Sequence, residues 1–136
     1  MNKLSRIFVV QDQYMRDQET GALVSKFDFT KAKEFGELKF LLAPNANPFS
    51  PNQGVVRELT TKLRGFEESD YLLLTGNPIL IGWATALAAL SNNGKIKMLQ
   101  WNPRRQCYLE VRVGLFEFVD KAGDEVEALV EPNGNR

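Results

Sequence analysis

Short apolar runs separated by polar turns divide this chain into expected strands and helices. Runs rich in leucine and β-branched side chains are typical of strands that are buried on both faces. Between these runs lie stretches with helical spacing or a helical cap. The pattern predicts buried strands at 7–10, 37–43, 70–75 and 95–101, a further extended segment at 22–29, and helices at 31–35, 50–64 and 79–90.

Ser50 and Asn77 mark the expected starts of the two longer helices. Pro51 follows Ser50 at the first helical position, and Gln53 stands at capping-box spacing from Ser50. Asn77 precedes a proline in the same way. Both sites therefore predict a helix N-terminus that directly follows a loop.

The two longer helices differ in the width of their apolar faces. The helix expected at 79–90 is apolar nearly all round. Such a helix is covered on more than one side, so we expect the sheet and a further element or subunit to cover it. The helix at 50–64 is expected to bury a single stripe, formed by Val55, Val56, Leu59, Leu63 and Phe66.

Alternating apolar and polar side chains at 107–113 predict a half-buried antiparallel strand at a sheet edge. Right-handed crossovers place the strands at 37–43, 70–75 and 95–101 side by side in parallel, joined by 7–10. Residues 115–130 fit either a hairpin or a short helix, and a polar tail begins at about 132. We therefore predict one α/β domain over residues 1–136, a three-layer sandwich with a mixed, mainly parallel sheet and an antiparallel edge hairpin.

Polar loops follow three of the expected parallel strands. In an open parallel sheet, ligands bind beyond the carboxyl ends of the strands, where helix N-termini also present N–H groups to anions. A small polar or phosphate-bearing ligand is the corresponding hypothesis. The residues expected to line such a site are Gln11, Asp12, Asn45, Asn47, Thr75, Gly76 and Asn77.

Simpler interpretations compete with each candidate site. Residues 75–78 form neither a P-loop nor a dinucleotide fingerprint, and a helix cap explains them fully. The acidic residues near the N-terminus lack the spacing of a calcium loop, so a solvated loop is favoured and no metal is expected. These acidic residues are Asp12, Asp17, Glu19 and Asp28.

A basic patch with aromatic residues is the third candidate. Arg104 and Arg105 stand in an expected turn, and an exposed Trp101 or Tyr108 would complete a surface for nucleic acid. Lys95 and Lys97 lie on the preceding strand. Arginines in turns are usually only solvated, so nucleic acid is not an expected partner.

Composition excludes several classes of enzyme. The chain has no histidine, which removes Ser-His-Asp and Cys-His catalysis and histidine-ligated metals. Its single cysteine, Cys107, lies in an alternating strand, where a packed thiol is favoured over a nucleophile. We therefore expect no catalytic residues and no cofactor.

Charge and hydropathy point to a protein of the cytoplasm. There are 17 Lys and Arg against 17 Asp and Glu, so formal net charge is zero and no general attraction to nucleic acid or membranes is expected. The N-terminal apolar run is too short for a signal peptide, and the helix at 79–90 is too short to span a bilayer. The use of cysteine fits a reducing compartment.

Four blocks of sequence carry a resemblance: 34–38, 41–49, 70–78 and 98–101. They are similar to uncharacterised small proteins encoded by bacteriophages, marine phages included. The resemblance covers roughly residues 7–113. It implies a phage or environmental source and an accessory protein that acts in the host cytoplasm, with no assigned activity to transfer.

These observations predict a non-enzymatic accessory protein that acts by binding a partner. A homodimer is the first expectation, and a host or phage protein is the other expected partner. The alternative is a small-ligand or nucleotide-binding domain that uses the loops at the carboxyl ends of the parallel strands. A nucleic-acid-binding module is a weaker third alternative.

Overall fold

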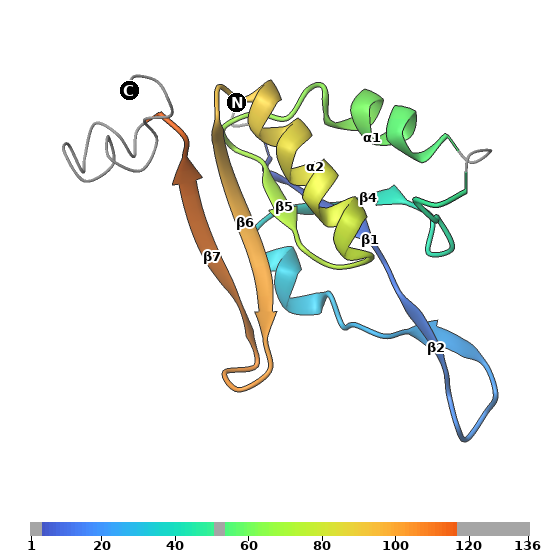
Figure 1. Cartoon of the computed structure of the whole chain (residues 1–136). Helices are drawn as coiled ribbons and strands as arrows, with labels where there is room; N and C mark the ends of the chain where they lie inside the picture. The colour runs from blue at the N-terminus through green and yellow to red at the C-terminus, as the bar shows by residue number, and fades with distance from the viewer. Residues whose placement is uncertain (1–3, 51–53, 117–136) are drawn as a thin grey trace, which may run out of the picture.

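A five-stranded sheet forms the centre of the computed structural model, which describes residues 4–50 and 54–116 (Figure 1). The predicted buried strands are all present. The elements in chain order are β1 (Arg6–Gln11), β2 (Tyr14–Arg16), β3 (Leu23–Ser25), the 3₁₀ helix η1 (Thr30–Glu34), β4 (Glu37–Leu42), α1 (Val55–Leu63), β5 (Tyr71–Leu73), α2 (Pro78–Ser91), β6 (Lys95–Asn102) and β7 (Cys107–Gly114).

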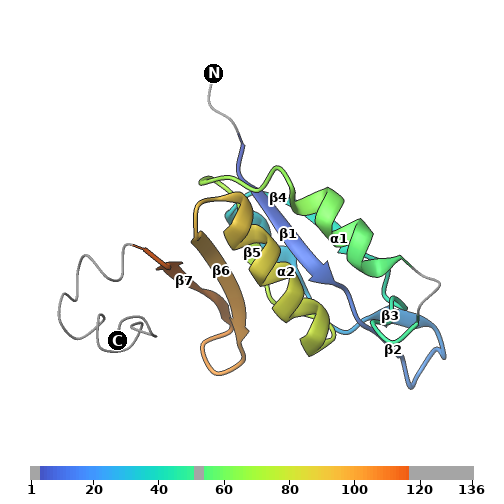
Figure 2. The same cartoon turned by 45° about the horizontal axis from the view of Figure 1, so that its top comes forward.

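The strand order β4-β1-β5-β6-β7 confirms the predicted mixed sheet. β4, β1, β5 and β6 are mutually parallel, and β7 pairs with β6 in the antiparallel sense at one edge. Helices α1 and α2 cover the same face of the sheet, as Figure 2 shows. The segment that carries η1 supplies the cover of the opposite face, so the two faces are covered by layers of unequal size.

The apolar run of β1 explains its central position. Phe8 and Val10 pack with α1 and α2 on one face, whereas Ile7 and Val9 pack with η1 on the other. Side chains alternate between the faces of a strand, so a strand buried on both faces must be apolar at every position. The sequence pattern therefore correctly predicts a central strand.

Arg6 and Asp70 join β1 and β5 at the end opposite the predicted site. Asp70 is fully buried, and its carboxylate accepts hydrogen bonds from Arg6 Nε at 3.0 Å and Arg6 NH2 at 2.7 Å. The backbone N–H of Glu67 donates to the same carboxylate at 2.9 Å. The hydrogen bonding of Arg6 to the Asp70 carboxylate is the main cause that raises the pKa of Arg6. The pair fixes the start of β5 relative to β1.

Several local predictions were wrong. Helix α1 begins at Val55 and not near Ser50, because Gly54 is its N-cap in the left-handed region at φ 63°. Val56, expected in the buried stripe, is 57% exposed. The expected helix at 31–35 is the 3₁₀ helix η1, which begins at Thr30.

β3 lies within the extended segment expected at 22–29, whereas β2 and its pairing with β3 were not predicted, because the residues of both strands are exposed and show no core-facing pattern. The β2–β3 hairpin extends beyond the end of the sheet (Figure 1). The proposed hairpin or helix at 115–130 and the tail from about 132 lie almost entirely outside the described residues. Residues 51–53, which include the expected Gln53 of the capping box, also lie outside them.

Candidate functional site

β1 and β5 are neighbours whose connections leave in opposite directions. The chain passes from β1 to β4 on one side and from β5 to β6 on the other. In open α/β sheets, this arrangement leaves a crevice outside the carboxyl ends of the two strands, where ligands bind. Four of the predicted residues, Gln11, Thr75, Gly76 and Asn77, follow or end these strands and lie together here.

Gln11 connects the three loops at this crevice. Its side chain is buried, and its Nε2 donates to the carbonyl oxygens of Ala46 at 2.8 Å and of Ala43 and Pro44 at 3.2 Å. Its Oε1 accepts the backbone N–H of Asn77 at 2.9 Å. Gln11 therefore binds the loop after β4 and the start of α2 at once, and its own side chain occupies the space between them.

Gly76 allows this close approach. A Cβ at this position would lie 2.6 Å from the Cβ of Gln11 and 2.9 Å from its Oε1, which is shorter than any ordinary contact. The residue also has φ 122°, a conformation that favours glycine. The packing of Gln11 against the turn thus explains why a glycine stands at position 76.

Asn77 is the predicted cap of α2. Its side-chain oxygen accepts the backbone N–H of Ile79 at 2.8 Å, and Pro78 occupies the first helical position. The N–H groups of Asn77 and Ile79 are therefore both satisfied within the chain. An anion at this helix N-terminus would have to compete with Gln11 and with the cap.

The other predicted site residues lie at the margins of the crevice. Asp12 is half-buried and accepts hydrogen bonds from Gln13 N and Ser25 Oγ, both at 2.8 Å, which joins it to the β2–β3 hairpin. Asn47 is exposed and accepts the N–H of Phe49 at 2.8 Å. Asn45 is exposed in the same loop. The structure thus brings the predicted loops to one end of the sheet, while only part of each loop enters the crevice.

The side chain of Thr75 has a buried polar group without a hydrogen-bond partner among the described residues of the crevice. This group is the hydroxyl oxygen, and the residue is 7% exposed. Buried hydroxyl groups are normally hydrogen-bonded. A bound water or a small polar ligand at this position would therefore give the Thr75 hydroxyl the hydrogen-bond partner that it lacks.

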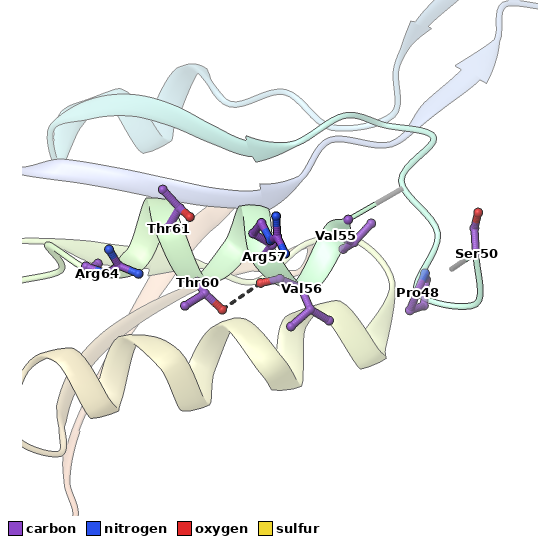
Figure 3. Close-up of a pocket in the computed structure, with 9 residues that line it drawn as sticks. Pro48, Ser50, Val55, Val56, Arg57, Thr60, Thr61 and Arg64 are labelled. Atoms are coloured by element: carbon purple, nitrogen blue, oxygen red, sulfur yellow. Dashed lines mark hydrogen bonds between the residues drawn. The ribbon is translucent and has the colours of Figure 1, made fainter. Parts of the chain in front are cut away.

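An open groove runs along α1, which sequence reasoning missed (Figure 3). It has a volume of about 640 Å³. In Figure 3, Val56 and Thr60 extend toward α2, and Thr60 donates to the carbonyl oxygen of Val56 at 2.8 Å. The lining residues of the groove are Pro48, Ser50, Gly54, Val55, Val56, Arg57, Thr60, Thr61 and Arg64.

The candidate basic and aromatic surface near the β6–β7 turn depends on exposed aromatic rings. Tyr108 is buried under η1, and its hydroxyl donates to the carbonyl oxygen of Asp28 at 3.3 Å. Burial, with a smaller contribution from the Asp28 carboxylate, raises the pKa of Tyr108 to about 12. Trp101 packs edge-on against Tyr108, with ring centroids 5.0 Å apart. Tyr108 is therefore too buried to stack on nucleic acid bases, whereas Trp101 is half-buried.

An apolar surface lies on the helical face of the sheet. Helix α2 packs inward through Leu80, Ala84 and Ala88 and leaves another side exposed. On β7, Val111 and Val113 pair with Met98 and Ile96 of β6, so they point to the face that α2 covers. We call this surface the α2–β7 face; its exposed residues are Ile79, Trp83 and Leu90 of α2 and Val111 and Val113 of β7.

The family model of the Phage Pam3 gp32-like protein matches residues 5–115. The chain belongs to this family. The match extends from just before β1 to just after β7, so the crevice, the groove and the α2–β7 face all lie within the part of the chain that defines membership. The resemblance to uncharacterised phage proteins is thereby confirmed.

No curated protein and no solved structure matches the chain. In the described part of the chain, no three acidic, cysteine or histidine side chains gather where they could hold a metal ion. Cys107 is half-buried as a free thiol. No helix of the described residues is long and apolar enough to cross a membrane.

Proposed function

We propose that this phage protein acts by association with another protein, in the first place a second copy of itself, and that it catalyses no reaction of its own. The observation that supports the proposal is the α2–β7 face. Trp83 is 46% exposed, Leu90 81% and Val111 53%. Large apolar side chains that gather on one face of a small domain are typical of interaction surfaces.

The location of these residues favours one continuous interface. The exposed side of α2 and the exposed valines of β7 belong to the same face of the sheet, and β7 is its edge strand. Zero formal net charge gives little repulsion between copies. A symmetric dimer is the commonest closed assembly, and a stable one buries about 1,200–2,000 Å² in total.

The buried polar residues also favour a binding role over a catalytic one. Gln11 and Asp70 each use their polar atoms in hydrogen bonds that connect strands and loops. The absence of histidine removes the commonest general base. A panel of phosphatase, esterase and dehydrogenase substrates should give no turnover; turnover that is lost in Gln11→Ala or Asp12→Ala would contradict this part of the proposal.

Analytical ultracentrifugation of two matched variants tests the association. Leu90→Glu places a charge on the α2–β7 face, and Phe49→Glu places one in the loop after β4. Both positions are strongly exposed, at 81% and 73%, so neither change should disturb folding. We expect Leu90→Glu to dissociate the dimer and Phe49→Glu to leave it intact. Equal sedimentation of both variants and the unmodified protein would contradict a role for this face.

A second candidate function is the binding of a small polar ligand at the crevice, and the unpartnered hydroxyl of Thr75 is the observation that favours it. Inorganic phosphate and ATP are the probes. Amide chemical shifts of Thr75, Gly76 and Asn77 should change on titration and saturate if either binds there. Shifts that do not change at millimolar concentrations of both probes would remove this candidate.

A further inference from the structure

Strand β7 is a long, open edge. It lies at the end of the sheet, pairs with β6 over residues 107–114, and contains no proline. No other strand of the described residues pairs with its outer side. Edge strands of this kind pair with another strand unless charges, bulges or covering segments prevent it.

The hydrogen bonds to β6 determine which residues of β7 face outward. The N–H of Leu115 donates to the carbonyl oxygen of Gly94 at 3.0 Å, so these two residues form a hydrogen-bonded pair. The antiparallel register continues from there, with Lys95 opposite Gly114 and Asn102 opposite Cys107. Hydrogen-bonded and non-hydrogen-bonded pairs alternate in an antiparallel ladder. The odd-numbered residues of β7 therefore direct their backbone groups to β6, and the even-numbered residues 108, 110, 112 and 114 direct theirs to the open edge.

We propose that two copies of the chain pair through β7, antiparallel, around a two-fold axis at Val111. The inference rests on the proposed self-association and names its interface. In this register Glu110 lies opposite Arg112 of the partner subunit, and Arg112 lies opposite Glu110 of the partner subunit. Both are outward-facing positions, so each pair also exchanges backbone hydrogen bonds across the edge.

The charges of β7 select this register over its neighbours. An axis at Glu110 would place the two Glu110 carboxylates opposite each other, and an axis at Arg112 would do the same for the two guanidinium groups. Like charges directly opposite are destabilising, whereas opposite charges stabilise a cross-strand pair. The side chain of Arg112 is 71% exposed and forms an ion pair with Glu110 of its own strand, so it can turn toward the partner.

The opposite face of the strand is complementary as well. With the axis at Val111, the two Val111 side chains meet, and Leu109 lies opposite Val113 of the partner subunit. These side chains point to the face that α2 covers. The pairing thus buries the exposed valines and brings the α2 helices of both copies onto one face of a continuous sheet.

Charge reversal tests the register. Glu110→Arg alone and Arg112→Glu alone each place like charges opposite, and each should raise the dimer dissociation constant about tenfold or more. The double reversal restores opposite charges and should return the constant to within about threefold of the unmodified value. Glu37 and Lys39 provide the matched control, since they form the same i, i+2 ion pair, at 3.3 Å, on the other edge strand, β4. Reversals at these two positions should have no effect.

A disulfide trap tests the axis directly. In a Cys107→Ser background, Val111→Cys would place two thiols at a non-hydrogen-bonded pair, with Cα atoms about 4.5 Å apart, a separation that a disulfide can span. Oxidised glutathione should convert this variant to a covalent dimer. Val113→Cys is the control, because its two copies would be about 14 Å apart along the strands. Equal cross-linking of both variants would overturn the axis at Val111.

The outcomes separate this inference from the proposed function. Both proposals are supported if the single β7 reversals weaken the dimer, the double reversal restores it, and the β4 control reversals leave it unchanged. If the dissociation constant of the dimer does not change in the β7 reversals, self-association still stands, but pairing through β7 is overturned. An unmodified protein that is monomeric at all concentrations overturns both.

Discussion

Gln11→Ala should destabilise the fold, because Gln11 connects three loops through buried hydrogen bonds. The change removes the donor to Ala46 at 2.8 Å and the acceptor of the Asn77 N–H at 2.9 Å. It also removes the weaker bonds to Ala43 and Pro44, which are themselves exposed residues, so water can replace them. A buried group left unpaired costs about 1–3 kcal/mol, so the loss of the two strong bonds together predicts a loss of about 2–6 kcal/mol.

Urea denaturation followed by circular dichroism measures this loss. The free energy of unfolding falls linearly with urea, and its extrapolation to water gives the difference between variants. All proteins must be compared at one concentration, since association makes apparent stability depend on concentration. A loss below about 0.5 kcal/mol, the usual range for surface substitutions, would refute the assigned role of Gln11.

Gln11→Glu is the matched variant of similar size. At neutral pH it places a carboxylate against three carbonyl oxygens, so it should be less stable than the unmodified protein. Burial should raise the pKa of this Glu above its unfolded value of about 4.3. Its protonated form can donate a hydrogen bond again, so the contribution of this Glu to stability is complete below about pH 4.3 and is lost as pH rises through the folded pKa. A variant whose deficit does not change with pH would contradict this explanation.

Three further changes have expected outcomes in the same urea assay. Asp70→Ala leaves the guanidinium of Arg6 without its buried partner and should cost about 2–4 kcal/mol. Asn77→Ala removes the cap of α2 and should cost about 1 kcal/mol. Tyr108 has its pKa raised to about 12, so its contribution to stability is complete below its unfolded pKa and is lost as pH rises toward 12. Tyr108→Phe should therefore reduce the decline of stability at high pH, and an unchanged decline would contradict the assigned cause.

The sequence was sufficient for the parallel sheet and for α2, because these elements follow from local signals. The run 7–10 is apolar at every position, as a strand buried on both faces requires, and Asn77 with Pro78 marks the start of α2. The start of α1 was misplaced because Gly54 adopts a left-handed conformation that interrupts an otherwise good capping pattern. A capping motif in the sequence therefore does not show whether a later glycine will delay the start of the helix.

The candidate site was only partly predictable for a different reason. Parallel strands place their following loops at one end of the sheet, so the meeting of residues 11, 43–46 and 75–77 could be expected. The role of Gln11 could not, because it depends on three carbonyl groups and one N–H that only the folded loops bring together. The open edge of β7 was foreseen from its alternating pattern, whereas the exposure of Val56 depends on how α1 lies beside α2.

The molar mass of the unmodified protein in solution tests the central claim most directly. Light scattering at micromolar concentration, repeated after tenfold dilution, distinguishes a chain of 15.4 kDa from a pair of twice that mass. We predict the mass of a dimer at the higher concentration, with any dissociation appearing only on dilution. A constant mass of 15.4 kDa at both concentrations would contradict self-association and, with it, the pairing through β7.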